Sequence, residues 1–286
     1  MAGKNSFIRI DSHQHFWRYD PGRDVWITEE IAVLKRDFLP EELIQRMCEA
    51  GVDRTIAVQA DQSETETHFL LDLTAENSAI AGVVGWVNLL DKNIDERLEC
   101  FSRHTKLRGF RHIVQAEHDD RFMIREDFLR GVAALARHNF TYDILIYARQ
   151  LPGAVEFVRR FPAQKFVLDH LAKPSIKAGE IDAWANNIRA LARNRNVYCK
   201  LSGLVTEANW TNWNAETLRP YLDVAFEAFG TDRLMFGSDW PVCLLAASYS
   251  QVKEVIENYT RDFSPSEKEN IFGLNAARFY GLTAQG

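Results

Sequence analysis

The sequence predicts an α/β protein that folds as a single (β/α)8 barrel of the TIM type. Short runs rich in β-branched and aromatic residues alternate with longer amphipathic runs, which is the pattern of repeated βα units around a parallel sheet. A chain of 286 residues suits one such barrel. No linker or charge block divides it, so we expect one domain over residues 1–286. The expected strands are 6–12, 54–59, 80–88, 107–113, 141–147, 164–169, 196–201 and 233–237.

The segments between the expected strands have helical signals. Apolar residues recur at three- and four-residue intervals in four segments, so these helices should pack against the outside of the sheet: 64–77, 126–139, 179–194 and 214–229. Capping residues support several helix ends. These are Ser63 with Glu66, Ser264 with Glu267, Pro40 in a first turn, and Gly51 and Gly230 at C-caps.

Two connections are unusually long and rich in aromatic residues, and both follow expected strands. They cover residues 16–39 and 202–213. The first contains Trp17, Tyr19 and Trp26, and the second contains Trp210 and Trp213. Long loops in compact domains are typical of binding elements.

Composition and charge exclude several classes of protein. The formal net charge of -6 leaves no basic excess for nucleic acid. The cysteines Cys48, Cys100, Cys199 and Cys243 form no C-x-x-C pair, so we expect reduced core thiols. Neither an export signal nor an apolar run long enough for a bilayer is evident, so we expect a cytoplasmic protein without a membrane partner. A small molecule is the expected partner, and a homo-oligomer is left open.

Polar residues end most of the expected strands, and in a parallel barrel these ends meet at the face where active sites lie. The residues are His13, His15, Gln59, Arg111, His112, Tyr147, Arg149, Asp169, His170, Lys200, Ser202 and Asp239. His13 and His15 therefore lie at the end of strand one, His170 at the end of strand six and Asp239 at the end of strand eight. Because strand side chains at i and i+2 share a face, His13 and His15 can converge on one point.

One divalent cation could be held by these residues together, and zinc is the metal we expect. The ligands would be His13, His15, His170 and Asp239. Taken singly, each histidine is as well explained by a hydrogen bond to the backbone. As a set, these residues favour a site, and the lack of cysteine ligands disfavours a structural zinc.

Asp239 is the expected general base, because a carboxylate beside a bound water can take its proton during attack. Burial would raise its pKa and a neighbouring cation would lower it. The alternative role is the N-cap of a following helix.

Arg111 and His112 end one strand, and either could donate to a developing oxyanion, although alternation lets only one of them face inward. Arg108 is better explained as a surface or rim ion-pair former. Lys200 fits a substrate contact and a rim salt bridge about equally well. Phosphate-binding glycine loops and a G-x-S-x-G elbow are absent, so nucleotide and serine hydrolase chemistry lack their usual signals.

Three segments resemble the amidohydrolase superfamily: DSHQHFW at 11–17, VLDHLAKP at 167–174 and FGSDWP at 236–241. More narrowly, the chain is similar to its sugar-lactonase branch, whose substrates include L-fucono- and L-rhamnono-lactones. The resemblance covers nearly the whole chain and includes RGFRH at 108–112.

This resemblance implies a distorted (β/α)8 barrel that opens a lactone with an activated water. By position it assigns His13, His15, His170 and Asp239 as the metal and catalytic residues, with one cation that could be dispensable. Strand four ends without a bridging lysine or glutamate, which disfavours a binuclear centre. Stabilisation of the oxyanion would fall to the cation or to the imidazole of His170, with Arg111 as a further donor. For a sugar substrate, Trp17 could cover the ring, and Gln59, His112 and Tyr147 could bind its hydroxyls.

Three alternatives stay open. A hydrolase of a carboxylated lactone, of the muconolactone or pyrone type, would need several arginines at the pocket, for which Arg18, Arg111 and Arg149 are available. A metal-dependent decarboxylase of the same superfamily would share the strand-one and strand-eight residues. A sugar-acid binding protein would use the pocket without catalysis.

Overall fold

In the computed structural model, which describes residues 7–282, eight parallel strands pair in chain order, from β1 to β8. This arrangement confirms the predicted barrel. The strands are β1 Ile10–Gln14, β2 Arg54–Val58, β3 Ile80–Gly85, β4 Leu107–His112, β5 Thr141–Ile144, β6 Phe166–Leu168, β7 Val197–Leu201 and β8 Leu234–Phe236.

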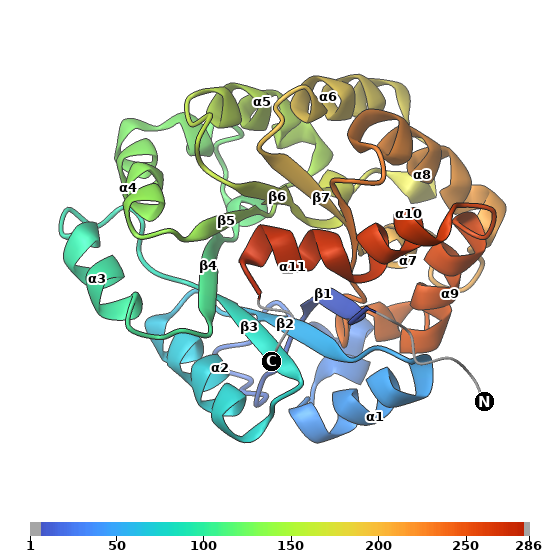
Figure 1. The fold of residues 1–286 in the computed structure, drawn as a ribbon, viewed down its shortest axis with the longest axis horizontal. Helices are drawn as coiled ribbons and strands as arrows, with labels where there is room; N and C mark the ends of the chain where they lie inside the picture. Colours follow the sequence, from blue (N-terminus) through green and yellow to red (C-terminus); the bar gives the residue numbers. More distant parts are fainter. Residues whose placement is uncertain (1–6, 283–286) are drawn as a thin grey trace.

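Helices surround these strands, and α11 lies across the middle of the ring (Figure 1). The helices are α1 Pro40–Ala50, α2 Glu64–Glu76, α3 Ile94–Phe101, α4 Glu126–Arg137, α5 Leu151–Arg159, α6 Asp182–Ala192, α7 Leu204–Glu207, α8 Ala215–Phe229, α9 Tyr249–Tyr259, α10 Pro265–Glu269 and α11 Asn275–Tyr280. Shorter turns include η1 Glu29–Leu34, η2 Val114–Ala116, η3 Phe122–Ile124, η4 Ala148–Gln150, η5 Asp169–Ala172, η6 Ile176–Ala178, η7 Val242–Leu245 and η8 Asn270–Leu274.

The predicted helix ends are largely correct. Ser63 accepts from the backbone N–H of Glu66, and Ser264 forms a capping box with Glu267. Pro40 opens α1, and Gly51 ends it with a left-handed φ of 67°. The helix expected from residue 179 begins only at Asp182, because Gly179 has a left-handed φ of 71° and ends the preceding turn.

The first strand begins and ends later than predicted, so His13 lies within β1. Its pairing with β2 matches Asp11 to Thr55 but Gln14 to Ala57, so one extra residue is inserted on β1. Such a bulge bends a strand and redirects its side chains, and bulges are common beside active sites. The predicted strand 6–12 also includes position 6, which lies outside the described residues.

The barrel is closed by the loop after β8. The N–H of His15 donates to the carbonyl of Trp240 at 2.7 Å, and the N–H of Asp239 donates to the carbonyl of His13 at 2.8 Å. These bonds join the first and last strands where their carboxyl ends meet. Segments more than 220 residues apart therefore lie side by side, as the sequence predicted.

The long aromatic loop 16–39 is held by its own packing. Trp17 is 2% exposed, donates from its indole nitrogen to the carbonyl of Arg36 at 3.0 Å, and contacts Trp26 and Phe38 edge-on. The structure thus places Trp17 in the core beneath the loop, away from the substrate role expected for it. The expectation of core cysteines is half correct, because Cys199 and Cys243 are buried whereas Cys48 and Cys100 are exposed.

Across residues 7–282, no helix combines the length and hydropathy that crossing a bilayer requires.

Glu66 in the first turn of α2 couples stability to pH. It is 4% exposed, and burial raises its pKa from 4.5 to about 7, against the backbone N–H of Ala60 and the charge of Arg23. Between these two pH values the folded protein holds a proton that the unfolded chain has released. Stability from this residue is therefore present at acidic pH and is lost as pH rises through about 7.

We expect Glu66→Gln to raise the free energy of unfolding at pH 8 by about 3 kcal/mol and to leave it unchanged at pH 4.5. The glutamine amide would keep an oxygen that can accept from Ala60, so only the ionisation is removed. Urea unfolding at both pH values measures this, with Glu76→Gln on the exposed end of α2 as control. A gain of equal size at both pH values would contradict the assignment.

Candidate active site

Three imidazoles and one carboxylate meet at the carboxyl ends of β1, β6 and β8. His13 Nε2 lies 3.2 Å from His15 Nε2 and 3.7 Å from Asp239 Oδ1. His15 Nε2 and His170 Nε2 lie 3.4 and 3.8 Å from the same oxygen. All four residues are at most 5% exposed. The structure therefore brings together the residues that the sequence predicted to converge.

Each imidazole is held by a partner on its other nitrogen. His15 Nδ1 donates to the carbonyl of Val58 at 2.8 Å, and His170 Nδ1 lies 2.8 Å from Ser202 Oγ. His13 Nδ1 lies 3.3 Å from Asp169 Oδ1 and 3.0 Å from Lys200 Nζ. At His15 the proton on Nδ1 leaves the lone pair of Nε2 free to point at the shared centre, as in many metal sites.

The backbone around His170 and Asp239 is unusual. His170, Leu171, Ala172 and Lys173 all have left-handed φ values between 49° and 59°, and Asp239 has a φ of 57°. Non-glycine residues rarely adopt this region, and such strain is concentrated at functional sites. The backbone turns here so that both side chains face the same point.

Two glycines leave room for the histidines. A Cβ on Gly203 would lie 2.8 Å from the His170 ring, and one on Gly237 would lie 2.8 Å from the Cβ of His13. Gly203 also has a left-handed φ of 70°. Side chains at these positions would displace both imidazoles.

Electrostatics set the protonation of the site. Burial, with the positive charge of Lys200, lowers the pKa of His13 well below its usual value, and burial does the same for the pKa of His170. Burial alone would raise the pKa of Asp239, but His170, His15 and Lys173 outweigh it and lower that pKa. At neutral pH the site thus holds His13 and His170 as neutral imidazoles beside an ionised carboxylate.

The donor set fits a divalent cation. Ligand atoms of His13, His170 and Asp239 all lie within 4.8 Å of one another, and His15 adjoins two of them. Tetrahedral zinc ligands at about 2.0–2.2 Å from the metal stand roughly 3.3 Å apart. The observed separations of 3.2 to 3.8 Å are close to that value.

Arg111 faces inward and is fixed beside this cluster. Its Nη1 lies 3.0 Å from Asp169 Oδ2 and 3.4 Å from His13 Nε2, and its Nη2 donates to the carbonyl of Gln59. The Gln59 amide donates to the carbonyl of Arg111 at 3.1 Å. Gln59, expected at a sugar hydroxyl, is fully buried and holds Arg111 instead.

His112 points the other way, as strand alternation requires. Its Nε2 lies 2.7 Å from Glu117 Oε1, and its ring stacks on Phe122. The structure therefore removes His112 from the group of substrate contacts. Tyr147 is 38% exposed at the rim, with Lys173 Nζ 5.7 Å from its ring centre, so it remains available to a ligand.

A buried ion network supports the site from below, and the sequence did not reveal it. Lys200 Nζ lies 2.5 Å from Asp143 Oδ2 and 2.9 Å from Asp169 Oδ1, and none of the three side chains is exposed. Tyr280 of α11 donates to Asp143 Oδ2 at 2.8 Å. The expected rim salt bridge of Lys200 is therefore wrong, and its fully buried side chain does not favour the alternative of a substrate contact.

The two carboxylates of this network differ in their pKa. Burial raises the pKa of Asp143 to about 6, although Lys200 opposes this. Lys200, His13 and Arg111 together outweigh burial at Asp169 and hold its pKa well below the usual range. Asp169 is therefore the firmly ionised partner of Arg111 and Lys200.

Asp11 is a second residue that the sequence analysis passed over. Its carboxylate accepts from the N–H and hydroxyl of Ser238 at 2.9 and 2.6 Å, and from the N–H of His13 at 3.1 Å. It therefore ties β1 to the loop that carries Asp239. A lone aspartate inside an apolar strand was the available signal for both Asp11 and Asp143.

Comparison with known proteins places this geometry in a family. The sequence matches the amidohydrolase family over residues 10–282. The chain belongs to the amidohydrolase family. An L-fucono-1,5-lactonase of Burkholderia multivorans is 46% identical over 286 residues, covering 96% of each chain. One of Burkholderia ambifaria is 35% identical over 279 residues, again with 96% of each covered.

A solved structure agrees with the sequence relatives. A Burkholderia multivorans amidohydrolase with bound zinc superposes with a TM-score of 0.93 at 45% identity, covering 96% of this amidohydrolase and 100% of that chain. The sugar-lactonase resemblance inferred from three motifs is confirmed at the level of the family.

Proposed function

We propose that this amidohydrolase hydrolyses a sugar lactone of the L-fucono-1,5-lactone type to its open-chain hydroxy acid. The observation that carries the proposal is the convergence of three Nε2 atoms on one ionised carboxylate, in a chain 46% identical to a protein with that activity. A carboxylate held beside neutral imidazoles is suited to activating water.

Asp239 takes a proton from a water molecule, whose oxygen forms a bond to the lactone carbonyl carbon. Negative charge then develops on the carbonyl oxygen, and the fixed guanidinium of Arg111 stabilises it. When this tetrahedral intermediate collapses, the bond between the carbonyl carbon and the ring oxygen breaks. The ring oxygen leaves as a hydroxyl after it receives the proton from Asp239.

His13, His15, His170 and Asp239 would hold one divalent cation, for which zinc is our proposal. When bound, such a cation polarises the carbonyl and adds positive charge near the oxyanion. The partners of the Nδ1 atoms of His15 and His170 suit this role. At the rim, Tyr147 is a candidate contact for sugar hydroxyls, and Trp210 is 38% exposed on the loop after β7.

The arginines distinguish between lactone classes. A carboxylated lactone would need several arginines at the pocket, but Arg18 and Arg149 are at the surface, paired with Asp37 and Asp120. Of the three arginines considered, only Arg111 lies in the buried site, and Asp169 already pairs with it. A neutral sugar lactone fits this charge balance better.

The test is a screen of aldonolactones with a pH indicator, with and without chelator. We expect acid release from L-fucono-1,5-lactone and little from carboxylated lactones. Release of carbon dioxide from an aromatic acid, with every lactone inert, would replace the proposal by the decarboxylase alternative. Binding of the sugar acid without turnover of any lactone would indicate a binding protein.

Metal content gives a separate prediction. We expect purified protein to hold about one zinc per chain and His170→Ala to lose most of it, because the ring supplies one of few ligands. Elemental analysis measures this, and His118→Ala at an exposed position is the matched control. Equal zinc in all three proteins would place the metal elsewhere.

A further inference from the structure

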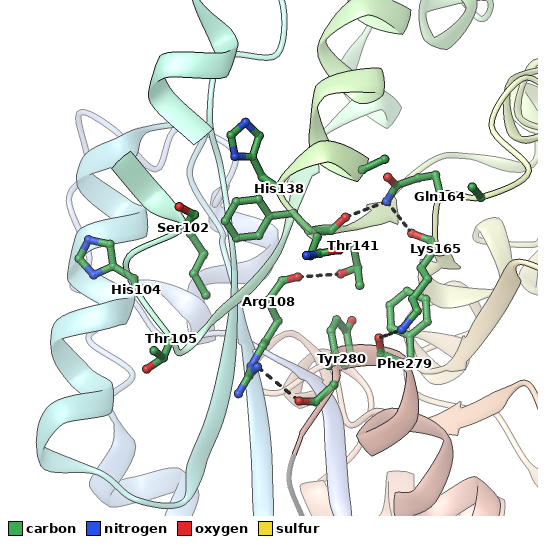
Figure 2. A pocket seen from close by; sticks show the side chains of 16 residues that line it. Ser102, His104, Thr105, Arg108, His138, Thr141, Gln164, Lys165, Phe279 and Tyr280 are labelled. Atoms are coloured by element: carbon green, nitrogen blue, oxygen red, sulfur yellow. Dashed lines mark hydrogen bonds between the residues drawn. The ribbon is translucent and has the colours of Figure 1, made fainter. Parts of the chain in front are cut away.

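A second concave site lies at the opposite end of the barrel from Asp239. A cavity of about 590 Å³ is bordered by Leu107 and Thr141, which begin β4 and β5, by Lys165 just before β6, and by Gly281 after α11 (Figure 2). In a parallel barrel the amino ends of the strands lie together, away from the catalytic face. The size suits a small organic ligand.

The lining of this cavity is basic. It includes the cations Arg108 and Lys165, and among the described residues neither aspartate nor glutamate lines it. This is notable in a protein with a formal net charge of -6. The cavity is therefore a local positive region in an acidic protein.

Among residues 7–282, the side-chain hydrogen bonds of the two cations of the cavity go to backbone oxygens. Arg108 Nη1 reaches the carbonyl of Gly281, at 3.4 Å, and Lys165 Nζ reaches that of Phe279, at 3.5 Å (Figure 2). Within residues 7–282, no carboxylate lies within 4.0 Å of the charged nitrogens of either side chain. Burial lowers the pKa of Arg108, because removing the charged guanidinium from water is unfavourable. No anion of the described chain offsets this desolvation cost.

Two buried polar atoms at the cavity also lack partners. Among the described residues, neither Arg108 Nε nor Gln164 Oε1 has a hydrogen bond. The amide nitrogen of Gln164 donates to the carbonyls of Phe140 and Lys165 at 2.9 and 3.0 Å, which fixes the orientation of the amide. Both atoms are fully buried, so the donors that the cavity offers to an anion are the charged nitrogens of Arg108 and Lys165.

Arg108 is fitted to its place by a glycine. A Cβ on Gly82 of β3 would lie 2.7 Å from Arg108 Cγ, so the glycine leaves room for the arginine stem across the neighbouring strand. The expected ion pair of Arg108 is not found among residues 7–282. The residue is half-buried, and within the described part of the chain no carboxylate balances its charge.

We propose that this cavity binds a small anion, with its carboxylate or phosphate group on Arg108 and Lys165. Charge-assisted hydrogen bonds to a guanidinium are strong and directional, so Arg108 should dominate the affinity. The site is independent of the proposed lactonase reaction, because it faces the other end of the barrel.

Calorimetric titration of the full chain with L-malate and with inorganic phosphate, in chloride buffer of matched ionic strength, tests this. We expect binding of at least one probe, a loss of about tenfold in affinity in Arg108→Gln, and a smaller but measurable loss in Lys165→Gln. Malate binding with phosphate inert identifies a carboxylate site, and the reverse identifies a phosphate site. Arg130→Gln is the matched control, because Arg130 also reaches a backbone carbonyl, that of Leu90 at 3.0 Å.

Circular dichroism shows whether each variant is folded. If Arg108→Gln does not fold, Lys165→Gln still tests the site. Two results would overturn the proposal. One is no binding of either probe to the wild-type protein. The other is equal affinity in the wild type, Lys165→Gln and Arg130→Gln, which would place the anion elsewhere.

Discussion

Replacing Lys200 by methionine is expected to lower the free energy of unfolding by about 3–5 kcal/mol. Lys200 is fully buried between the carboxylates of Asp143 and Asp169, at 2.5 and 2.9 Å. Methionine fills much of the same volume but removes the only cation that Asp143 contacts within 4.0 Å among the described residues. A buried carboxylate without a counter-charge must stay charged at high cost or take up a proton.

Urea unfolding of Lys200→Met measures this, with Lys92→Met at an exposed position as control. The double variant with Asp143→Asn should recover part of the loss, because the uncompensated charge is then gone. Arg111 still pairs with Asp169 in that variant. A loss below about 1 kcal/mol in Lys200→Met would show that the network is not a major source of stability.

Replacing Asp239 by asparagine is expected to lower kcat by about 10³-fold and to change KM little. Asparagine keeps the shape of the side chain and the backbone hydrogen bond to His13, but it cannot take a proton from water. The effect should therefore appear in the chemical step more than in substrate uptake.

Steady-state kinetics on L-fucono-1,5-lactone measures the change, and Asp72→Asn on the exposed face of α2 is the control. Zinc content is determined in parallel, so that loss of metal and loss of the base are separated. A kcat within about threefold of the wild type would remove Asp239 from the proton transfer.

The fold could be predicted because its determinants are local. Most strands are short runs rich in apolar residues, and Ser63, Pro40 and Gly51 mark helix ends by rules that need only neighbouring residues. The convergence of His13, His170 and Asp239 followed from topology alone, since every strand of a parallel barrel ends at the same face. Alternation along β4 also predicted that only one of Arg111 and His112 could face inward.

The remainder depends on contacts that local patterns do not contain. The bulge in β1 shifts its register, so the strand could not be bounded from its apolar residues. The ion network of Lys200 joins β5, β6 and β7, and only the closed barrel shows that these charges are buried together. Trp17 looked like a sugar-binding residue because a binding aromatic and a core aromatic have the same sequence signal.

Turnover of L-fucono-1,5-lactone in water labelled with heavy oxygen, with mass spectrometry of the product, tests most directly that a water activated at Asp239 attacks the lactone carbonyl. The account predicts label in the product carboxylate with the wild-type protein, and labelling by Asp239→Asn that is about 10³-fold slower after the spontaneous rate is subtracted. Label in the hydroxyl that was the ring oxygen, or wild-type rates in the variant, would contradict it.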